Sequence, residues 1–288
     1  MSMEFKKVSF YYNQNSKSPI TALKEVSLTI DKHEYVGLIG HTGSGKSTLV
    51  QHMNGLNKPS EGRVIVDGID TLAEKADLKT LRQRVGIVFQ YPEDQLFEET
   101  IYLDIAFGPK NLGLSEEEID LRVRESMEAV GLDFEEFKDQ SPFEISGGQK
   151  RRVAIAGVLA LKPSYLVLDE PTAGLDPRGR EEILREIREI YDSNPEMTIV
   201  LVTHSMEDIA EHASRIIVVD RGAIAMDGSP AEVFSRKDDL EKMGLSIPQI
   251  TGLMTALKER GLPVRGQVLT VEDAFGQLAG YLRGGRHE

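Results

Sequence analysis

The sequence predicts an α/β fold with a mixed core sheet built around a phosphate-binding loop. Residues 40–47 (GHTGSGKS) fit the pattern G-x-x-x-x-G-K-[ST]. The apolar run 34–39 before the loop is typical of a buried strand, and residues 47–54 after it of a short helix that ends at Gly55. A second apolar run, 164–170, ends in two carboxylates, and ligands of α/β sheets bind at such carboxyl ends of strands.

Length, charge and cysteine content exclude several classes of protein. The chain has 288 residues, a formal net charge of −13 and no cysteine. The acidic balance argues against binding to nucleic acid or anionic lipid by bulk electrostatics. Without cysteine there is no disulfide or thiolate site, as in a reducing cytosol. The longest apolar runs, such as 199–202 and 216–219, are strand-sized, and the first seven residues hold no apolar signal core. We therefore expect neither a spanning helix nor a leader.

The glycine loop has the chemistry of a nucleotide site. Its backbone N–H groups can approach phosphate oxygens, and the helix N-terminus adds its dipole. Lys46 would reach the β- and γ-phosphates, and Ser47 would offer its hydroxyl to Mg²⁺. The predicted ATP contacts in and beside the loop are Gly40, His41, Thr42, Gly43, Ser44, Gly45, Lys46, Ser47 and Thr48.

The segments around the loop predict further sheet structure. Residues 5–12 and 22–30 alternate apolar and polar positions, which indicates antiparallel strands. Tyr12 at the end of the first run is either sheet surface or a platform for a purine base. Residues 63–68 predict a strand, 77–84 a helix and 85–89 a buried strand, after which Gln90 is placed for contact with metal or water.

Residues 92–161 form a helical region. Ser115 and Glu118 predict a capping box at the start of a helix over 116–130 that ends at Gly131. Ser146-Gly147-Gly148-Gln149 precedes a helix over 150–161. By itself this start is either an N-cap with flexible glycines or a second anion trap.

Polar residues follow the remaining core strands. Asp169 and Glu170 end the strand 164–170, where adjacent side chains point opposite ways, so one can hold Mg²⁺ while the other faces a water molecule. Asp176-Pro177 starts the helix 178–191. His204 follows the strand 197–203, and Ser205 is the N-cap of the next helix.

The C-terminal part predicts a small appended domain. Residues 215–221 and 223–227 make a hairpin, and Ser229-Pro230 opens a short helix. We assign residues 3–234 to the main domain, with the helical subdomain at about 92–161, and residues 235–288 to the appendage. Two helices are predicted in the appendage, over 248–260 and 271–283, the second with Thr270 as N-cap.

Together these motifs resemble the ATP-binding cassette family over about residues 3–230. The resemblance covers the P-loop, the Q-loop Gln90, the signature 145–149 (ISGGQ), Walker B at 165–170, the D-loop 173–177 and the switch histidine His204. Ile145 stands where leucine is commoner. The segments 89–97 and 141–144 and the appendage are similar to those of cobalt and energy-coupling-factor importers, in particular the second of the paired ATPase subunits.

The resemblance implies a head-to-tail dimer with a second ATPase subunit, a paralogue or a second copy, that sandwiches ATP. Glu170 would be the general base, His204 would orient the γ-phosphate, and Tyr12 would stack on adenine. Mg²⁺ would contact Ser47, Gln90 and Asp169. Residues that act on the partner's nucleotide would be Ser146, Gly147, Gly148, Gln149 and Asp176.

The resemblance also implies a place at the cytoplasmic face of the cell membrane, with a transmembrane coupling protein and a substrate-binding membrane protein as partners. The cargo would be vitamins or related micronutrients; the alternative is a cobalt or nickel importer. No coiled coil is inserted between residues 47 and 146, which disfavours a DNA-repair ATPase, and one cassette disfavours a translation factor. Glu170 and His204 argue against an inactive binding module.

The segment after Gln90 is the predicted docking site of the membrane partner. Leu96 and Phe97 would line a groove for an apolar helix face, and nearby acids would meet the helix's basic residues. The acids expected at this rim are Glu93, Asp94 and Glu98.

Overall fold

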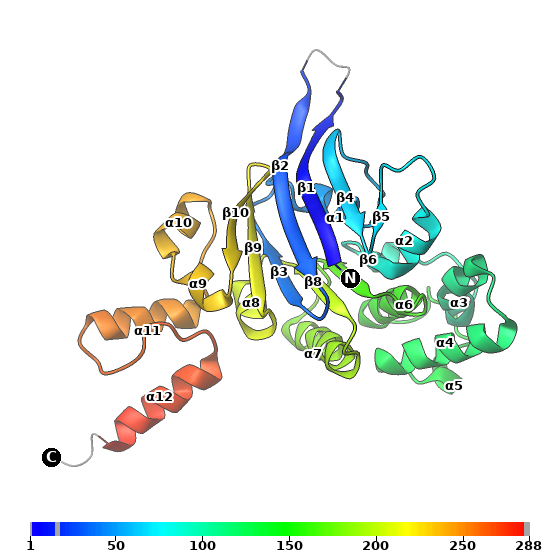
Figure 1. The fold of residues 1–288 in the computed structure, drawn as a ribbon. Helices are drawn as coiled ribbons and strands as arrows, with labels where there is room; N and C mark the ends of the chain where they lie inside the picture. The colour runs from blue at the N-terminus through cyan, green and yellow to red at the C-terminus, as the bar shows by residue number, and fades with distance from the viewer. Residues whose placement is uncertain (1, 15–17, 285–288) are drawn as a thin grey trace.

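The computed structural model describes residues 2–14 and 18–284 and contains two sheets (Figure 1). The larger sheet has the order β10-β9-β3-β8-β7-β6, in which only the β9–β10 pair is antiparallel. This mixed sheet agrees with the prediction, and β3, β6 and β8 are buried along their whole length, as their apolar sequences require. Its strands are β3 (Tyr35–Ile39), β6 (Val85–Val88), β7 (Tyr165–Asp169), β8 (Thr198–Val202), β9 (Arg215–Asp220) and β10 (Ala223–Gly228).

The second sheet is antiparallel and has the order β2-β1-β4-β5. The two antiparallel strands predicted near the N-terminus are therefore confirmed. Between the sheets lies an apolar cluster that includes Leu49, Val50 and Met53 of α1, so the helix after the P-loop is fixed on both sides. The elements are β1 (Ser2–Tyr12), β2 (Ile20–Asp31), α1 (Lys46–Met53), β4 (Glu61–Val66), β5 (Ile69–Asp70) and α2 (Leu78–Arg84).

Helices cover the other face of the larger sheet and share one core with it. In Figure 1 the helical subdomain, η1 to α6, lies at the lower right, and α7 and α8 lie below the strands. These elements are η1 (Pro92–Gln95), α3 (Ile101–Leu112), α4 (Glu116–Ala129), α5 (Phe134–Phe137), α6 (Gly147–Leu159), α7 (Pro177–Ser193) and α8 (Met206–His212).

Helix caps agree with the sequence in most places and differ at α4. Ser115 accepts a hydrogen bond from Glu118 N, but the reciprocal bond of the predicted capping box is not formed. The Glu118 carboxylate instead accepts from Arg122 Nε at 2.6 Å, one helical turn away. A complete capping box is present at Ser146 and Gln149, and α6 therefore begins at Gly147, earlier than predicted.

The C-terminal helices lie on the side of the sheets away from the helical subdomain (Figure 1). They are α9 (Pro230–Phe234), α10 (Lys237–Lys242), α11 (Gln249–Glu259) and α12 (Val271–Gly284), of which α10 is not predicted. Leu240 and Leu245 join the main core, whereas Met254, Val264 and Val268 belong to a separate small cluster. The backbone N–H of Asp273 donates to the Thr270 hydroxyl at 3.2 Å, as expected for an N-cap. The domain boundary at residue 235 remains a prediction.

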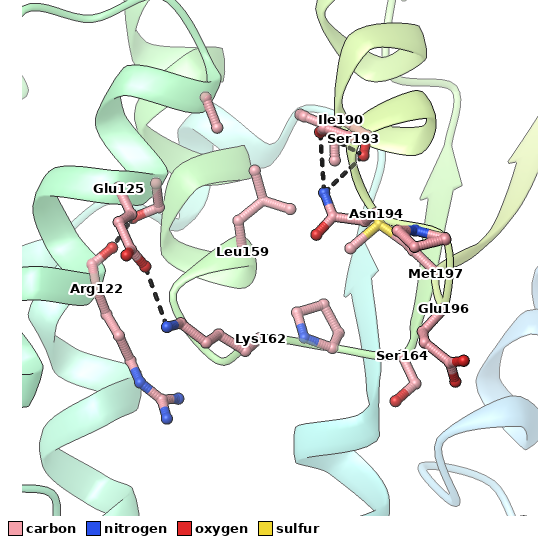
Figure 2. A pocket seen from close by; sticks show the side chains of 14 residues that line it. Arg122, Glu125, Leu159, Lys162, Ser164, Ile190, Ser193, Asn194, Glu196 and Met197 are labelled. Carbon is pink, nitrogen blue, oxygen red and sulfur yellow. Dashed lines mark hydrogen bonds and ion pairs between the residues drawn. The ribbon is translucent and has the colours of Figure 1, made fainter.

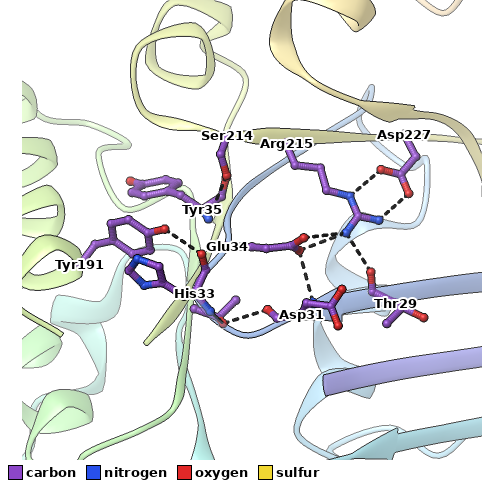
Figure 3. Close-up of polar contacts among 10 residues, drawn as sticks. Thr29, Asp31, His33, Glu34, Tyr35, Tyr191, Ser214, Arg215 and Asp227 are labelled. Atoms are coloured by element: carbon purple, nitrogen blue, oxygen red, sulfur yellow. Dashed lines mark hydrogen bonds and ion pairs between the residues drawn. The ribbon is translucent and has the colours of Figure 1, made fainter. Parts of the chain in front are cut away.

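An ionic network fixes the start of the P-loop strand (Figure 3). Arg215 donates to both Asp227 oxygens at 2.7 Å, to Glu34 at 3.0 Å and to the Thr29 carbonyl at 2.9 Å. The hydrogen bonds to Asp227 raise the pKa of Arg215 above its usual range. Bidentate pairs of this kind are the strong ones, so the network ties β9, β10, β2 and the entry to β3 together.

Candidate nucleotide-binding and catalytic site

The P-loop connects β3 to α1 and is closely packed against two other strands. A Cβ at Gly40 would lie 2.3 Å from the Val219 carbonyl of β9. At Gly45, which has a φ of 112°, a Cβ would lie 2.6 Å from the Ala22 carbonyl of β2. Both positions therefore require glycine, and the loop is held in one shape before any ligand arrives.

Two side chains of the loop show how it would receive phosphate. Lys46 Nζ donates to the carbonyls of Gly40 at 2.6 Å and His41 at 3.1 Å, so the ammonium lies across the loop. Burial lowers the pKa of Lys46, and the charges of Glu170 and Asp169 oppose that change. The Ser44 hydroxyl is buried and has no hydrogen-bond partner among the described residues. A bound phosphate could accept hydrogen bonds from both the Lys46 ammonium and the Ser44 hydroxyl.

His41 turns away from the predicted phosphate position. Its Nε2 lies 3.1 Å from Asp220 Oδ1 at the end of β9, and its Nδ1 lies 2.7 Å from the Thr42 carbonyl. The ring thus braces the loop against β9. A direct contact of the His41 side chain with ATP remains a prediction.

Tyr12 stands at the end of β1 beside the same helix. Its hydroxyl lies 3.1 Å from Thr48 Oγ1, and its ring makes an edge contact with Phe10 at a centroid distance of 4.9 Å. The side chain is 39% exposed. Base stacking requires a ring that is fixed in position and accessible to the ligand. The contact with Thr48 places the Tyr12 ring close to the P-loop.

The two carboxylates of Walker B lie at the end of β7. Asp169 is the last strand residue, and Glu170 follows with a φ of 52°, a strained conformation for this residue. Burial raises the pKa of Asp169, while Lys46 and a hydrogen bond with Ser47 lower it. Burial, and next the charge of Asp169, raise the pKa of Glu170 to about 7. A carboxylate with a pKa near 7 has the property that a general base needs at neutral pH, and the role of Glu170 as that base remains a prediction.

His204 follows β8 and lies beside Glu170. Its Nε2 lies 3.2 Å from Glu170 Oε1, which is buried. Burial, and next the charge of Lys46, lower the pKa of His204. The lowered pKa favours the neutral imidazole, which can both donate and accept.

Side-chain oxygens near the P-loop could serve as ligands of Mg²⁺. Among residues 2–14 and 18–284 there is no group of three or more His, Cys, Asp or Glu side chains that could hold a metal. The Ser47 hydroxyl and the Asp169 carboxylate nevertheless form an oxygen pair beside the P-loop. Mg²⁺ bound with nucleotides commonly takes only one or two protein oxygens in addition to phosphates and water, so this pair fits it. Gln90, the third predicted ligand, is exposed just beyond β6.

The signature and D-loop residues lie elsewhere in the chain. Asp176 is the N-cap of α7, and Ser146 that of α6. No hydrogen bond or ion pair between described residues joins them to the P-loop. A Cβ at Gly147 or Gly148 would meet nothing within 4 Å, and neither residue has a positive φ. Since glycine in a helix costs about 0.5–1 kcal/mol relative to alanine, the packing of this chain alone does not explain the pair.

A cavity in the helical region does not belong to this site. Figure 2 shows a pocket of about 560 Å³ between α4 and α6 on one side and the end of α7 on the other. Lys162 is paired there with Glu125 at 3.0 Å. None of its lining residues is a predicted ATP contact, so cavity size does not locate the chemistry.

One buried residue near the site has no signal in the sequence analysis. Arg151 on α6 pairs with Glu93, which we predicted at the rim of a docking groove. Glu93 is therefore not a free charge, because its carboxylate, with 21% of the side chain exposed, pairs with a buried guanidinium; its place at the rim of a docking groove remains a prediction. The sequence signal that could have indicated this residue is the pair of adjacent arginines, Arg151 and Arg152, within one helix.

Comparison with known proteins defines the family. The ABC transporter family matches residues 23–173 of the chain. A protein of Caldanaerobacter subterraneus subsp. tengcongensis is 57% identical over 99% of both chains, and one of Clostridium tetani is 53% identical over 96% of both. Each is named "Energy-coupling factor transporter ATP-binding protein EcfA2". The chain belongs to this ABC family. Its resemblance to ATP-binding cassette proteins, predicted from the motifs, is thereby confirmed.

Solved structures of the ABC family confirm the predicted fold. CbiO1 of Clostridium perfringens, described as part of the transporter complex cbiONQ, has a TM-score of 0.72 and 38% identity, over 88% of this chain and 98% of that one. The cassette MJ0796, in a dimeric post-hydrolysis state bound to ADP and phosphate, has a TM-score of 0.70 and 32% identity. This likeness covers 79% of the chain and 98% of MJ0796. No helix in the described part of the chain is long and apolar enough to span a membrane.

Proposed function

We propose that this chain is an ATP-hydrolysing subunit of an energy-coupling-factor importer of vitamins or related micronutrients. The observation that carries the proposal is the meeting of Lys46, Asp169, Glu170 and His204 at the carboxyl ends of β3, β7 and β8. The names of the relatives favour an energy-coupling-factor transporter over the alternative, a cobalt or nickel importer. The chain would act at the cytoplasmic face of the membrane.

Substrate binding follows from the P-loop geometry. Backbone N–H groups of residues 40–48 and the N-terminus of α1 would hold the phosphates, with the Lys46 charge on the β- and γ-phosphates. Tyr12 would stack on adenine. Ser47 and Asp169, with Gln90, would hold Mg²⁺, which when bound neutralises developing phosphate charge.

Hydrolysis would use the carboxylate and the histidine together. Glu170 would take the proton of the attacking water, and its pKa of about 7 leaves it ionised in a large share of molecules at neutral pH. The neutral His204, 3.2 Å from Glu170, would donate toward the γ-phosphate. The charge of Lys46 and the hydrogen bond with Ser47 would favour the ionised form of Asp169 and so oppose the effect of burial, which raises its pKa.

The site would be completed by a second ATPase subunit, a paralogue or another copy. Gly147 and Gly148 leave open space at the N-terminus of α6, which the partner's nucleotide would fill. Ser146, Gln149 and the D-loop Asp176 would act there in trans. The dimeric MJ0796 cassette supports such an arrangement.

The contact with a transmembrane coupling protein, and through it with a substrate-binding membrane protein, would lie after Gln90. Phe97 is 58% exposed and makes an edge contact with Phe107 at a centroid distance of 5.0 Å. Asp104 accepts from the N–H groups of Phe97 and Glu98 and so fixes the loop. Exposed aromatic anchors of this kind suit an apolar helix face.

Glu170→Gln tests the function. The amide keeps the size of the carboxyl but cannot accept the proton, so we expect ATP binding to remain and turnover to fall by about 10²–10⁴-fold. The measurement is phosphate release by the assembled complex beside nucleotide affinity. Glu135→Gln, on the surface of the helical subdomain, is the control. Near wild-type hydrolysis by Glu170→Gln would refute the role of Glu170 as base.

A further inference from the structure

Arg151 is the largest fully buried side chain among the described residues, with 2% of the side chain exposed. It lies on α6, five positions after the signature Ser146. A buried charge is tolerated only with a close partner, and Arg151 has one in Glu93. Its Nε donates to Glu93 Oε2 at 3.1 Å and its Nη2 to Oε1 at 2.6 Å. The carboxylate of η1 is thus held by two parallel bonds.

The remaining nitrogen of the same guanidinium binds the loop after the catalytic carboxylate. Arg151 Nη1 donates to the carbonyls of Pro171 at 3.0 Å and Ala173 at 2.7 Å. The turn of that loop begins at Glu170, whose carbonyl accepts from the backbone N–H of Ala173 at 3.1 Å. One planar group therefore links the segment after Gln90 to the backbone that carries Glu170.

The same two segments also approach each other at a second place, where the Tyr91 ring lies near Gly174. Gly174 has a φ of 77°, and a Cβ there would lie 3.7 Å from Cε1 of the Tyr91 ring. Tyr91 itself has a φ of 55°, so the chain turns sharply just after Gln90. The Arg151 bonds therefore hold together two segments that also lie close to each other where the Tyr91 ring approaches Gly174.

We propose that Arg151 is a positioning residue for ATP hydrolysis, which fixes the loop after Glu170 against the segment 91–93 with Glu93 as its counter-ion. The proposal rests on the proposed function, because it takes Glu170 as the base. Arg151 touches neither water nor nucleotide in this scheme. It acts by keeping the Glu170 backbone in place, and lysine cannot replace it because a single ammonium lacks the fork of donors.

The test uses the complex with its partner ATPase subunit and the variants Arg151→Gln, Arg151→Lys and Glu93→Gln. A catalytic group misplaced by about 1 Å can cost ~10²-fold, so we expect kcat to fall about 10- to 100-fold in Arg151→Gln. ATP affinity should stay within about twofold, because the P-loop is untouched. Arg151→Lys keeps a cation beside Glu93 and should recover thermal stability more than kcat. A purely structural role would make stability and kcat recover together.

Arg152 provides the matched control on the same helix. It donates to Glu186 at 2.7 Å and Glu182 at 3.1 Å, and both lie on α7, away from the catalytic loop. Arg152→Gln should lower the melting temperature without a comparable loss of kcat. If Arg151→Gln and Glu93→Gln lower kcat no more than Arg152→Gln does, or only raise KM, the proposal is overturned.

A double-mutant cycle gives a further readout. Because Glu93 and Arg151 act as one unit, Glu93→Gln with Arg151→Gln should reduce kcat no further than the worse single variant. Losses that multiply would contradict the proposal. Glu93→Gln keeps the side-chain size and serves alone should Arg151→Gln fail to fold. Failure of the proposed function is distinguishable, because it would show as full activity of Glu170→Gln or as no ATP hydrolysis by the wild type.

Discussion

Glu170→Gln should stabilise the protein against heat, and the gain should grow with pH. Burial raises the pKa of Glu170 from 4.5 to about 7, so the folded state disfavours the ionised form more than the unfolded state does. At a pH below the pKa of the unfolded state, the carboxyl is protonated in both states, so its raised pKa does not lower the free energy of unfolding. As the pH rises toward the folded pKa, the unfolded chain releases the proton first, and stability is lost. Glutamine fills the same space without a charge and escapes this loss.

The size of the gain follows from the same pKa. At 1.36 kcal/mol per pKa unit, the rise from 4.5 to about 7 corresponds to about 3 kcal/mol as an upper limit. The side chain is 15% exposed and His204 lies nearby, so solvent and the imidazole reduce the cost. About half of the limit, ~2 kcal/mol, is a realistic gain above pH 7. For a chain of 288 residues, with an unfolding entropy of ~2.1 cal/mol/K per residue, that is about 3 °C in melting temperature.

The assay is thermal unfolding of the nucleotide-free wild type and Glu170→Gln at several pH values from about 5.5 to 8.5. The difference in melting temperature should increase up to about pH 7.5 and then level off. Glu135→Gln is a control of opposite sign, because a hydrogen bond from Lys138 lowers the pKa of exposed Glu135. A difference that is independent of pH, or larger at the acid end, would refute the assignment of a buried, reluctantly ionised carboxyl.

Three other substitutions test separate parts of the site. Lys46→Ala should weaken ATP binding about 10- to 100-fold in a calorimetric titration, since a charged hydrogen bond is worth ~1.5–3 kcal/mol; unchanged affinity would contradict the P-loop assignment. A Cβ at Gly148 meets nothing within 4 Å, so Gly148→Leu should leave the ATP affinity of the isolated chain intact while hydrolysis by the dimer falls about 10²-fold; a monomer that fails to bind ATP would count against the sandwich. Phe97→Ala should keep the ATPase activity of the soluble dimer but weaken association with the membrane partner by about 2 kcal/mol, and unchanged co-purification would move the docking site elsewhere.

Much of the fold could be predicted because its signals are local. The P-loop pattern, the apolar strand runs and the caps at Ser146, Asp176 and Ser205 each depend on a few neighbouring residues. The grouping of Lys46, Asp169, Glu170 and His204 could also be expected, since parallel strands of one sheet bring their carboxyl ends together.

The differences arise where partners are distant or signals are short. Helix α10 contains a single buried apolar residue, Leu240, so its sequence has no helical period to detect. Glu118 meets both conditions of a capping box, yet Arg122 one turn later competes for its carboxylate. In each case a contact outside the local pattern decides the conformation.

The pairing of Glu93 with Arg151 near the site could not be predicted from the local sequence either. In the sequence it stands among acids and exposed aromatics, a pattern typical of a charged rim, and its partner Arg151 is 58 residues away. The carbonyls that complete the Arg151 shell belong to Pro171 and Ala173 and carry no side-chain signal at all. Motifs therefore predict the groups expected to contact ATP, because chemistry restricts their residue types. The groups that hold those motifs in register are found only from packing, because backbone carbonyls and any well-placed carboxylate can serve a buried guanidinium equally well.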